Sequence, residues 1–193
     1  MENVIKRNTP ILPNGILAML FVIVTEVMFF FSMISAYIVN RASSRIPWPP
    51  LDQPRLPIEM TGVNTIILIA SGAVFGSTMF FINKWDQNKT KNFLWSSFSL
   101  GLLFVLVQGY EWTKLIEYGM STEKSLFASF FYTIIGAHAL HVVDGLIIML
   151  VIISQFLKEP NRDEVKFRLQ VLGVYWYFVV LIWPFLYYMV YLY

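Results

Sequence analysis

Two histidines and an aspartate share one short stretch of the chain, GAHALHVVDG, and are the first candidates for chemistry. His138 and His141 are three residues apart and share one face of a helix. Asp144 lies three residues further on, within reach of His141 but not of His138. Zinc or iron needs three or four suitably placed ligands, and the chain has no other histidine. Glu111 could add a ligand, but no spacing requires it. We therefore predict no metal site, and hydrogen bonds between helices instead.

Besides Asp144, two further carboxylates lie inside apolar stretches. Glu26 is near the middle of the stretch that contains VIVTEVMFF, and Glu111 is in VQGYEWTK, one turn after Gln108. An ionisable group at membrane depth costs a few kcal/mol, so it persists only if something offsets that cost. Glu26 is either a proton-binding or lipid-contacting carboxylate, or a neutral acid that is hydrogen-bonded for packing. We expect Glu111 to be a structural partner of a polar group on a neighbouring helix.

The motifs of several enzyme classes are missing. The chain has no nucleophile with an adjacent base and no phosphate-binding glycine loop, and its lack of cysteine excludes disulfides and thiolate-bound metals. The sequence therefore predicts no catalytic centre and favours an accessory subunit.

The composition predicts the class of fold that holds these residues. Of the 193 residues, 57 % are hydrophobic and 13 % charged, with a mean hydropathy of +0.62. Soluble domains average about 45–50 % apolar and about 25 % charged residues. The net charge of +2 is carried in loops, which does not suggest nucleic-acid binding. We predict an all-α membrane protein.

Five apolar stretches are long enough to cross a bilayer. They predict a single transmembrane domain, residues 1–193, whose spans cover about residues 15–40, 61–83, 93–114, 126–157 and 171–193. Small residues in the second span should allow a neighbouring helix to approach closely: Ser71, Gly72, Ala73, Gly76 and Ser77.

The basic residues predict the orientation of this bundle of five helices. Nine lie on the side of the N-terminus: Lys6, Arg7, Lys84, Lys89, Lys91, Lys158, Arg162, Lys166 and Arg168. Five lie on the other side: Arg41, Arg45, Arg55, Lys114 and Lys124. The positive-inside rule then places the N-terminus in the cytoplasm and the C-terminus outside.

The same segments resemble subunit III of haem-copper oxidases, in order and over about residues 14 to 193. The resemblance lies in GILAMLFVIVTEVMFFFSMISAYI, NTIILIASG, QGYEW, GAHALHVVDG and YWYFVVLIWPFLYYMVY. Tyr177 and Val180 stand where the family usually has histidine and aspartate, Pro184 is unusual in that helix, and Asp144 is an added acid. The chain also lacks two N-terminal helices of the seven-helix form, and so is similar to the five-helix bacterial form.

The resemblance implies a non-catalytic subunit of a respiratory terminal oxidase in the bacterial cell membrane. Such a subunit holds no cofactor of its own, binds phospholipids, packs directly on subunit I, and supports proton uptake for oxygen reduction. Haem and copper belong to the partner subunits, among which subunit II and a possible subunit IV are expected. The resemblance also aligns Glu26 with the family's buried carboxylate, which favours an interior group that faces lipid or a partner.

Two alternatives remain open at the level of sequence. One is the equivalent subunit of a quinol oxidase or of a nitric-oxide-reductase-associated complex, because other subunits bind the electron donor. The other is an independent proton-coupled transporter that uses Glu26 and Asp144. The absence of an internal repeat and of a pair of broken helices counts against the transporter.

Overall fold

The computed structural model describes residues 13–51, 53–123, 125–156 and 161–193, and this part of the chain is helical, with no strand. The helices are α1 (Asn14–Ser43), α2 (Ile58–Asn83), α3 (Gln87–Glu117), α4 (Leu126–Gln155) and α5 (Arg162–Tyr187), which continues into a short π-helical turn, η1 (Tyr188–Leu192). All five α-helices are long and apolar enough to cross a membrane, as the composition predicts. Lys6, Arg7, Lys124 and Lys158, which were counted for the orientation, and Leu157, the predicted end of the fourth span, lie outside the described residues.

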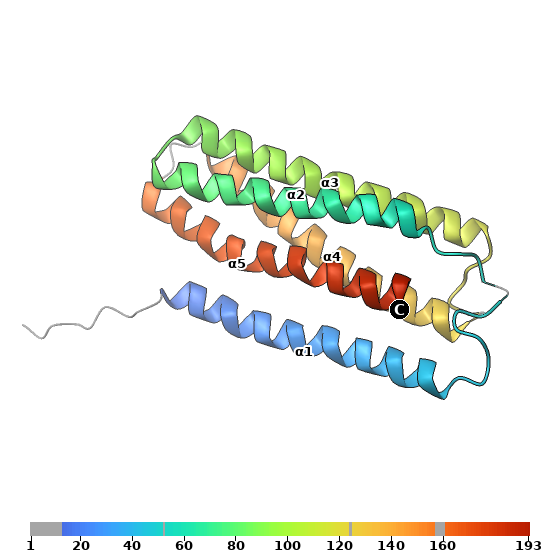
Figure 1. Cartoon of the computed structure of the whole chain (residues 1–193). Coiled ribbons are helices and arrows are strands. Elements are labelled where there is room, and N and C mark those ends of the chain that lie inside the picture. Colours follow the sequence, from blue (N-terminus) through green and yellow to red (C-terminus); the bar gives the residue numbers. More distant parts are fainter. Residues whose placement is uncertain (1–12, 52, 124, 157–160) are drawn as a thin grey trace, which may run out of the picture.

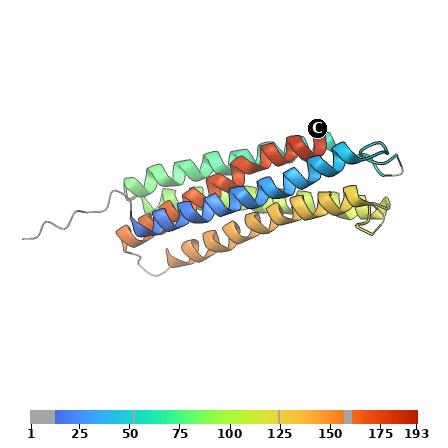
Figure 2. The same ribbon diagram turned by 90° about the horizontal axis from the view of Figure 1, so that it is seen from below.

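The helices form a bundle in which α5 packs on α1, α2 and α4, and α3 packs on α2 and α4. Figure 1 shows α2 and α3 side by side, with α1 at the far edge of the bundle beyond α5. The view from below shows α1 running between α4 and α5 (Figure 2). Within α1 only Phe30, Ile34 and Tyr37 are buried, at a helical spacing that gives a single narrow stripe. The rest of α1 is exposed or half-buried.

Two helices begin earlier than their apolar spans. The Asp86 side chain accepts a hydrogen bond from the Lys89 backbone N–H (3.0 Å) at the start of α3, and the same bond holds the pKa of Asp86 below its ordinary value. Asn161 caps α5 in the same way, at 3.0 Å from the Asp163 backbone nitrogen. These polar first turns are helical but lie outside the apolar stretch, so hydropathy does not reveal them.

A glycine ends α3. Gly119 has a φ of 92°, which is in the left-handed region, and its N–H donates to the Ile116 carbonyl at 2.9 Å. The next N–H, that of Met120, donates to the Leu115 carbonyl at 2.9 Å. The two bonds form a Schellman motif, which satisfies carbonyl groups that the end of a helix leaves open.

Small residues bring α2, α3 and α5 close together. The Ser71 hydroxyl of α2 donates to the Ser97 carbonyl of α3, and the Ser97 hydroxyl donates to the Ser71 carbonyl, both at 3.0 Å. A Cβ on Gly72 would lie 3.0 Å from the Val180 side chain of α5. These contacts occur at two of the small residues that the sequence singled out for close approach.

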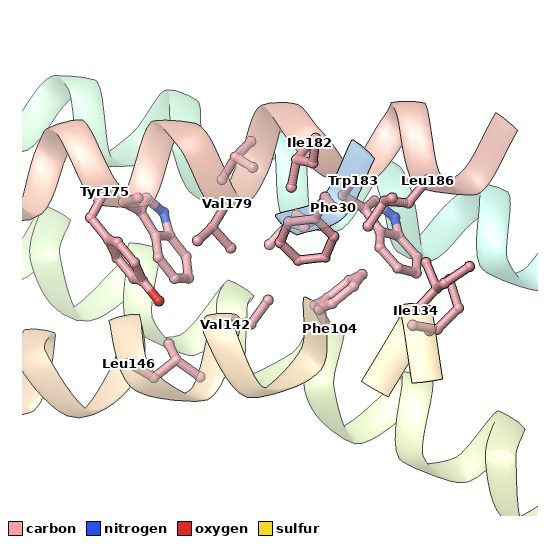
Figure 3. Close-up of a cluster of buried hydrophobic side chains, with 14 of the residues drawn as sticks. Phe30, Phe104, Ile134, Val142, Leu146, Tyr175, Val179, Ile182, Trp183 and Leu186 are labelled. Carbon is pink, nitrogen blue, oxygen red and sulfur yellow. The ribbon is translucent and has the colours of Figure 1, made fainter. Parts of the chain in front are cut away.

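Aromatic side chains fill the centre of the bundle, as Figure 3 shows for Phe30, Phe104 and Trp183, which come from three different helices. Trp176 and Trp183 are both fully buried. The Phe104 and Trp183 rings meet edge to face, with their centroids 4.9 Å apart. Packing of this kind stabilises a bundle in lipid, where burial of apolar surface contributes little.

Substitution of Gly145 should show how tightly this core is packed. A Cβ at Gly145 would lie 2.7 Å from the Trp176 ring, which is fully buried. We expect Gly145→Ala to lower the free energy of unfolding by about 1–3 kcal/mol through overpacking. Gly109→Ala is the control, because nothing lies within 4 Å of its Cβ position, and it should leave stability unchanged or raise it. Unfolding of the full chain in mixed detergent micelles measures both, and equal stability of the two variants would contradict this packing.

Candidate functional site

A carboxylate and a histidine join α1 to α4 at membrane depth. The Glu26 Oε2 lies 2.9 Å from the His141 Nε2, and the exposed fractions of the two side chains are 27 % and 17 %. The other ring nitrogen of His141, Nδ1, lies 2.7 Å from the Ala137 carbonyl oxygen. The loosely packed helix α1 is thus tied to the bundle by a polar contact that is only half-buried.

The contact to Ala137 determines how the protons are arranged. A carbonyl oxygen only accepts, so the His141 Nδ1 must carry a hydrogen and donate it. The Nε2 then faces the Glu26 carboxyl either as an acceptor from a protonated acid, or as the N–H of an imidazolium beside a carboxylate. In both arrangements one proton lies between Glu26 and His141. The pair can therefore hold a proton and pass it between two groups without breaking the contact.

The surroundings hold the His141 ring in place. The Tyr175 hydroxyl of α5 donates to the His141 carbonyl at 3.1 Å, and the Phe30 ring centroid lies 5.2 Å from that of His141. A groove of about 400 Å³ opens beside the pair. Its lining includes Asp144, which is exposed and makes no hydrogen bond or ion pair with another described residue.

His138 lies in a different environment. It is fully buried, and its ring stacks on Trp183 with centroids 4.7 Å apart. Phe30 and Phe104 also border this ring, and neither of its nitrogens has a hydrogen-bond partner among the described residues. Although His138 and His141 are neighbours on α4, the structure directs one into the aromatic core and the other toward α1.

Glu111 belongs to a separate polar cluster, nearer the end of α3. Its Oε2 accepts a hydrogen bond from the Thr61 hydroxyl of α2 (2.9 Å) and another from the Gln108 amide (3.0 Å). The Gln108 amide also donates to the Tyr191 hydroxyl of η1 at 3.2 Å. From Thr61 the cluster extends to Thr65, whose hydroxyl donates to the Thr61 carbonyl (2.8 Å). Glu111 therefore links three segments of the bundle.

The five candidate residues thus occupy three places: a pair at Glu26 and His141 with Asp144 beside it, the core position of His138, and the cluster around Glu111. Sequence reasoning did not find Thr61, Thr65, Tyr175 or Tyr191 as members of these sites. Threonines at helical spacing were one available signal for Thr61 and Thr65, but threonine in a membrane helix usually bonds its own backbone. Within the described residues, no group of three or more His, Cys, Asp or Glu side chains lies close enough to bind a metal ion.

Comparison with known proteins identifies the family. The family described as cytochrome c oxidase subunit III matches residues 4–193. The chain belongs to this family. A relative from Synechocystis sp., named cytochrome c oxidase subunit 3, is 33 % identical over 171 residues, which are 88 % of this chain and 72 % of the relative. One from Nocardia farcinica, named probable cytochrome c oxidase subunit 3, is 30 % identical over 82 % of this chain and 78 % of its own length. The mouse protein named cytochrome c oxidase subunit 3 is 30 % identical over 96 % of the chain and 72 % of its own length.

Tyr177 and Val180, which depart from the usual pattern of the subunit III family, take part in packing between helices. Val180 lies against Gly72, and the Tyr177 ring meets Phe75 edge to face, with centroids 6.0 Å apart. Both residues therefore join α5 to α2 through apolar and aromatic contacts. Pro184 has no N–H to donate to the carbonyl one turn earlier, and α5 passes into η1 four residues after it.

Proposed function

We propose that this chain is the non-catalytic subunit III of a respiratory haem-copper terminal oxidase in a bacterial cell membrane, where it packs on and stabilises the catalytic subunit I. The observation that carries this proposal is the family match over residues 4–193, together with five helices among the described residues that are long and apolar enough to cross a membrane. The bacterial relatives, which the chain matches over most of its length, support a bacterial origin. Subunit II, a possible subunit IV and bound phospholipids complete the proposed assembly.

Among the described residues, the Glu26–His141 pair is suited to support proton uptake. The pair holds one proton between the carboxyl and the imidazole, and it borders an open groove rather than the sealed core. A proton that enters from the cytoplasmic side can be held there beside the partner subunit. The reduction of oxygen itself belongs to the haem and copper of the catalytic subunit.

The charge distribution supports an orientation with the N-terminus in the cytoplasm and the C-terminus outside. At the end of the bundle where α2 ends and α3 begins, the described residues include Lys84, Lys89 and Lys91, and the first turns of α5 add three further basic residues. The opposite end has Arg41, Arg45, Arg55 and Lys114 among the described residues. The end richer in Lys and Arg is the one that the positive-inside rule assigns to the cytoplasm.

Copurification tests the proposal. The full chain, tagged at one terminus, is solubilised from its native membranes in a mild detergent and analysed for bound haem. We expect it to elute with a haem-containing subunit, and elution without any haem protein would overturn the proposal. A copper-bearing subunit II in the same complex, together with the reduced-minus-oxidised spectrum, then distinguishes a cytochrome c oxidase from a quinol oxidase.

A further inference from the structure

Two carboxylates at membrane depth face the outside of the bundle. Glu26 on α1 and Asp144 on α4 line the same groove, which also contains the His141 ring. Asp144 is exposed, and the Glu26 side chain is 27 % exposed. Neither carboxylate is enclosed by the described residues, so whatever lies against this part of α1 and α4 in the membrane must contact both.

Their depth follows from helix geometry. At 1.5 Å per residue, α1 is about 45 Å long, so a hydrocarbon core of about 30 Å leaves about 7 Å of helix beyond it on each side. Glu26 lies about 18 Å from the start of α1, and Asp144 about 17 Å from the end of α4. Both are therefore about 10 Å inside the hydrocarbon. An aspartate side chain is too short to reach the interface from there.

Three exposed hydroxyl residues on the outer surface of α1 and α4 find a hydrogen-bond partner within their own helix. The hydroxyls of Thr25, Ser32 and Ser154 each donate to a backbone carbonyl one turn earlier, at 2.7 Å. Such residues tolerate a lipid environment, because their hydroxyl groups are not left without a hydrogen-bond partner. Asp144 has no such partner in the described part of the chain, and lipid tails supply none.

The seam between α1 and α4 is also hollowed at two levels. Besides the groove at Glu26, a second one of about 400 Å³ lies further along, lined by Ser32, Met33, Phe130 and neighbouring side chains. Exposed apolar residues, among them Val22 and Ile148, border the first groove. An apolar seam with a charged centre fits a transmembrane helix better than it fits lipid tails.

We propose that the groove formed by Val22, Glu26, His141, Asp144, Ile147 and Ile148 docks a transmembrane helix of the catalytic subunit, and that this helix presents a lysine or arginine to Asp144. The inference rests on the proposed function, since it names the face through which this chain contacts subunit I. The argument for the occupant is charge complementarity. His141 shares its proton with Glu26, so Asp144 is the carboxylate of this groove that has no cation partner among the described residues.

Single-cysteine crosslinking in native membranes tests the docking face, because the chain has no cysteine of its own. The full chain carries Val22→Cys or Ile148→Cys within the groove, or the matched controls Ile66→Cys or Ile69→Cys on the exposed face of α2. All four are labelled with a thiol-reactive photocrosslinker. We expect the groove positions to crosslink to the haem-bearing subunit at a yield about tenfold higher than that of the α2 positions.

The outcomes separate the two proposals. Equal yields from both faces, a higher yield from α2, a groove that crosslinks only to lipid, or one that crosslinks only to a subunit without haem would overturn the docking inference. Each of these results leaves the proposed function intact as long as the haem subunit still copurifies. If no position crosslinks to a haem subunit and none copurifies, the proposed function itself fails.

Reversal of the charge at Asp144 tests whether the partner helix presents a lysine or arginine to it. We expect Asp144→Lys to reduce the copurified haem by about tenfold or more, because it places two cations against each other in low dielectric. Ile69→Lys is the control for the cost of a lysine in the membrane, and should retain haem binding within about twofold of the unaltered chain. Equal loss in both variants would show that Asp144 faces no cation.

Discussion

Replacement of Trp183 by alanine is expected to lower the free energy of unfolding by about 3 kcal/mol. The Trp183 ring is fully buried and contacts Phe104 and His138, with centroid distances of 4.9 and 4.7 Å. Its N–H donates to the Thr65 hydroxyl at 2.9 Å. Removal of such a ring from a soluble core costs about 3–5 kcal/mol. We expect the lower end here, because lipid still surrounds the side chain when the helices separate, and the cavity accounts for most of the loss.

Two further variants separate the contributions to this loss. Trp183→Phe keeps much of the volume but loses part of the ring together with the hydrogen bond to Thr65, so it should cost about 1–2 kcal/mol, less than the alanine variant. Trp95→Ala is the same tryptophan-to-alanine change at a side chain that is 40 % exposed, and it should change the free energy of unfolding by less than about 1 kcal/mol. Unfolding of the full chain in mixed micelles of detergent and lipid measures the stability of all three variants. A Trp183→Ala variant as stable as Trp95→Ala would contradict the packing around His138.

The fold was largely predictable because lipid imposes a simple rule on the chain. Each crossing needs an apolar run that also satisfies its backbone hydrogen bonds, and five such runs are visible in the sequence. The ends of the helices were less predictable. The polar turns that begin α3 at Gln87 and α5 at Arg162 are held by the capping residues Asp86 and Asn161, which an apolar window does not detect.

The candidate site was predictable residue by residue, but not as contacts. The cost of a charge in lipid marked Glu26, His141 and Asp144 as unusual. That Glu26 meets His141, 115 positions away, depends on α1 packing against α4, and no spacing along the chain encodes this packing. The position of His138 depends in the same way on Trp183, which comes from α5.

Glu26→Lys is expected to reduce the amount of assembled complex by about tenfold or more, whereas Glu26→Gln should leave assembly largely intact. A glutamine side chain can donate from its amide to the His141 Nε2, so the contact between α1 and α4 is kept. A lysine places a charge about 10 Å inside the hydrocarbon, where an insertion cost of about 3 kcal/mol applies, and removes the carboxyl that shares the proton. Copurified haem per tagged chain, measured in native membranes, reports both variants.

Met28→Lys distinguishes the site from the general cost of a lysine in α1. Met28 is 67 % exposed and lies at nearly the same depth as Glu26, so its substitution carries a similar insertion cost without disturbing His141. If the pair with His141 matters, Glu26→Lys must lose more haem than Met28→Lys. Equal losses would mean that insertion alone explains the defect, and full assembly of both Glu26 variants would mean that Glu26 is not buried in the complex. Only an excess loss at Glu26, together with retention in Glu26→Gln, fits a carboxyl that holds α1 against α4 through a shared proton.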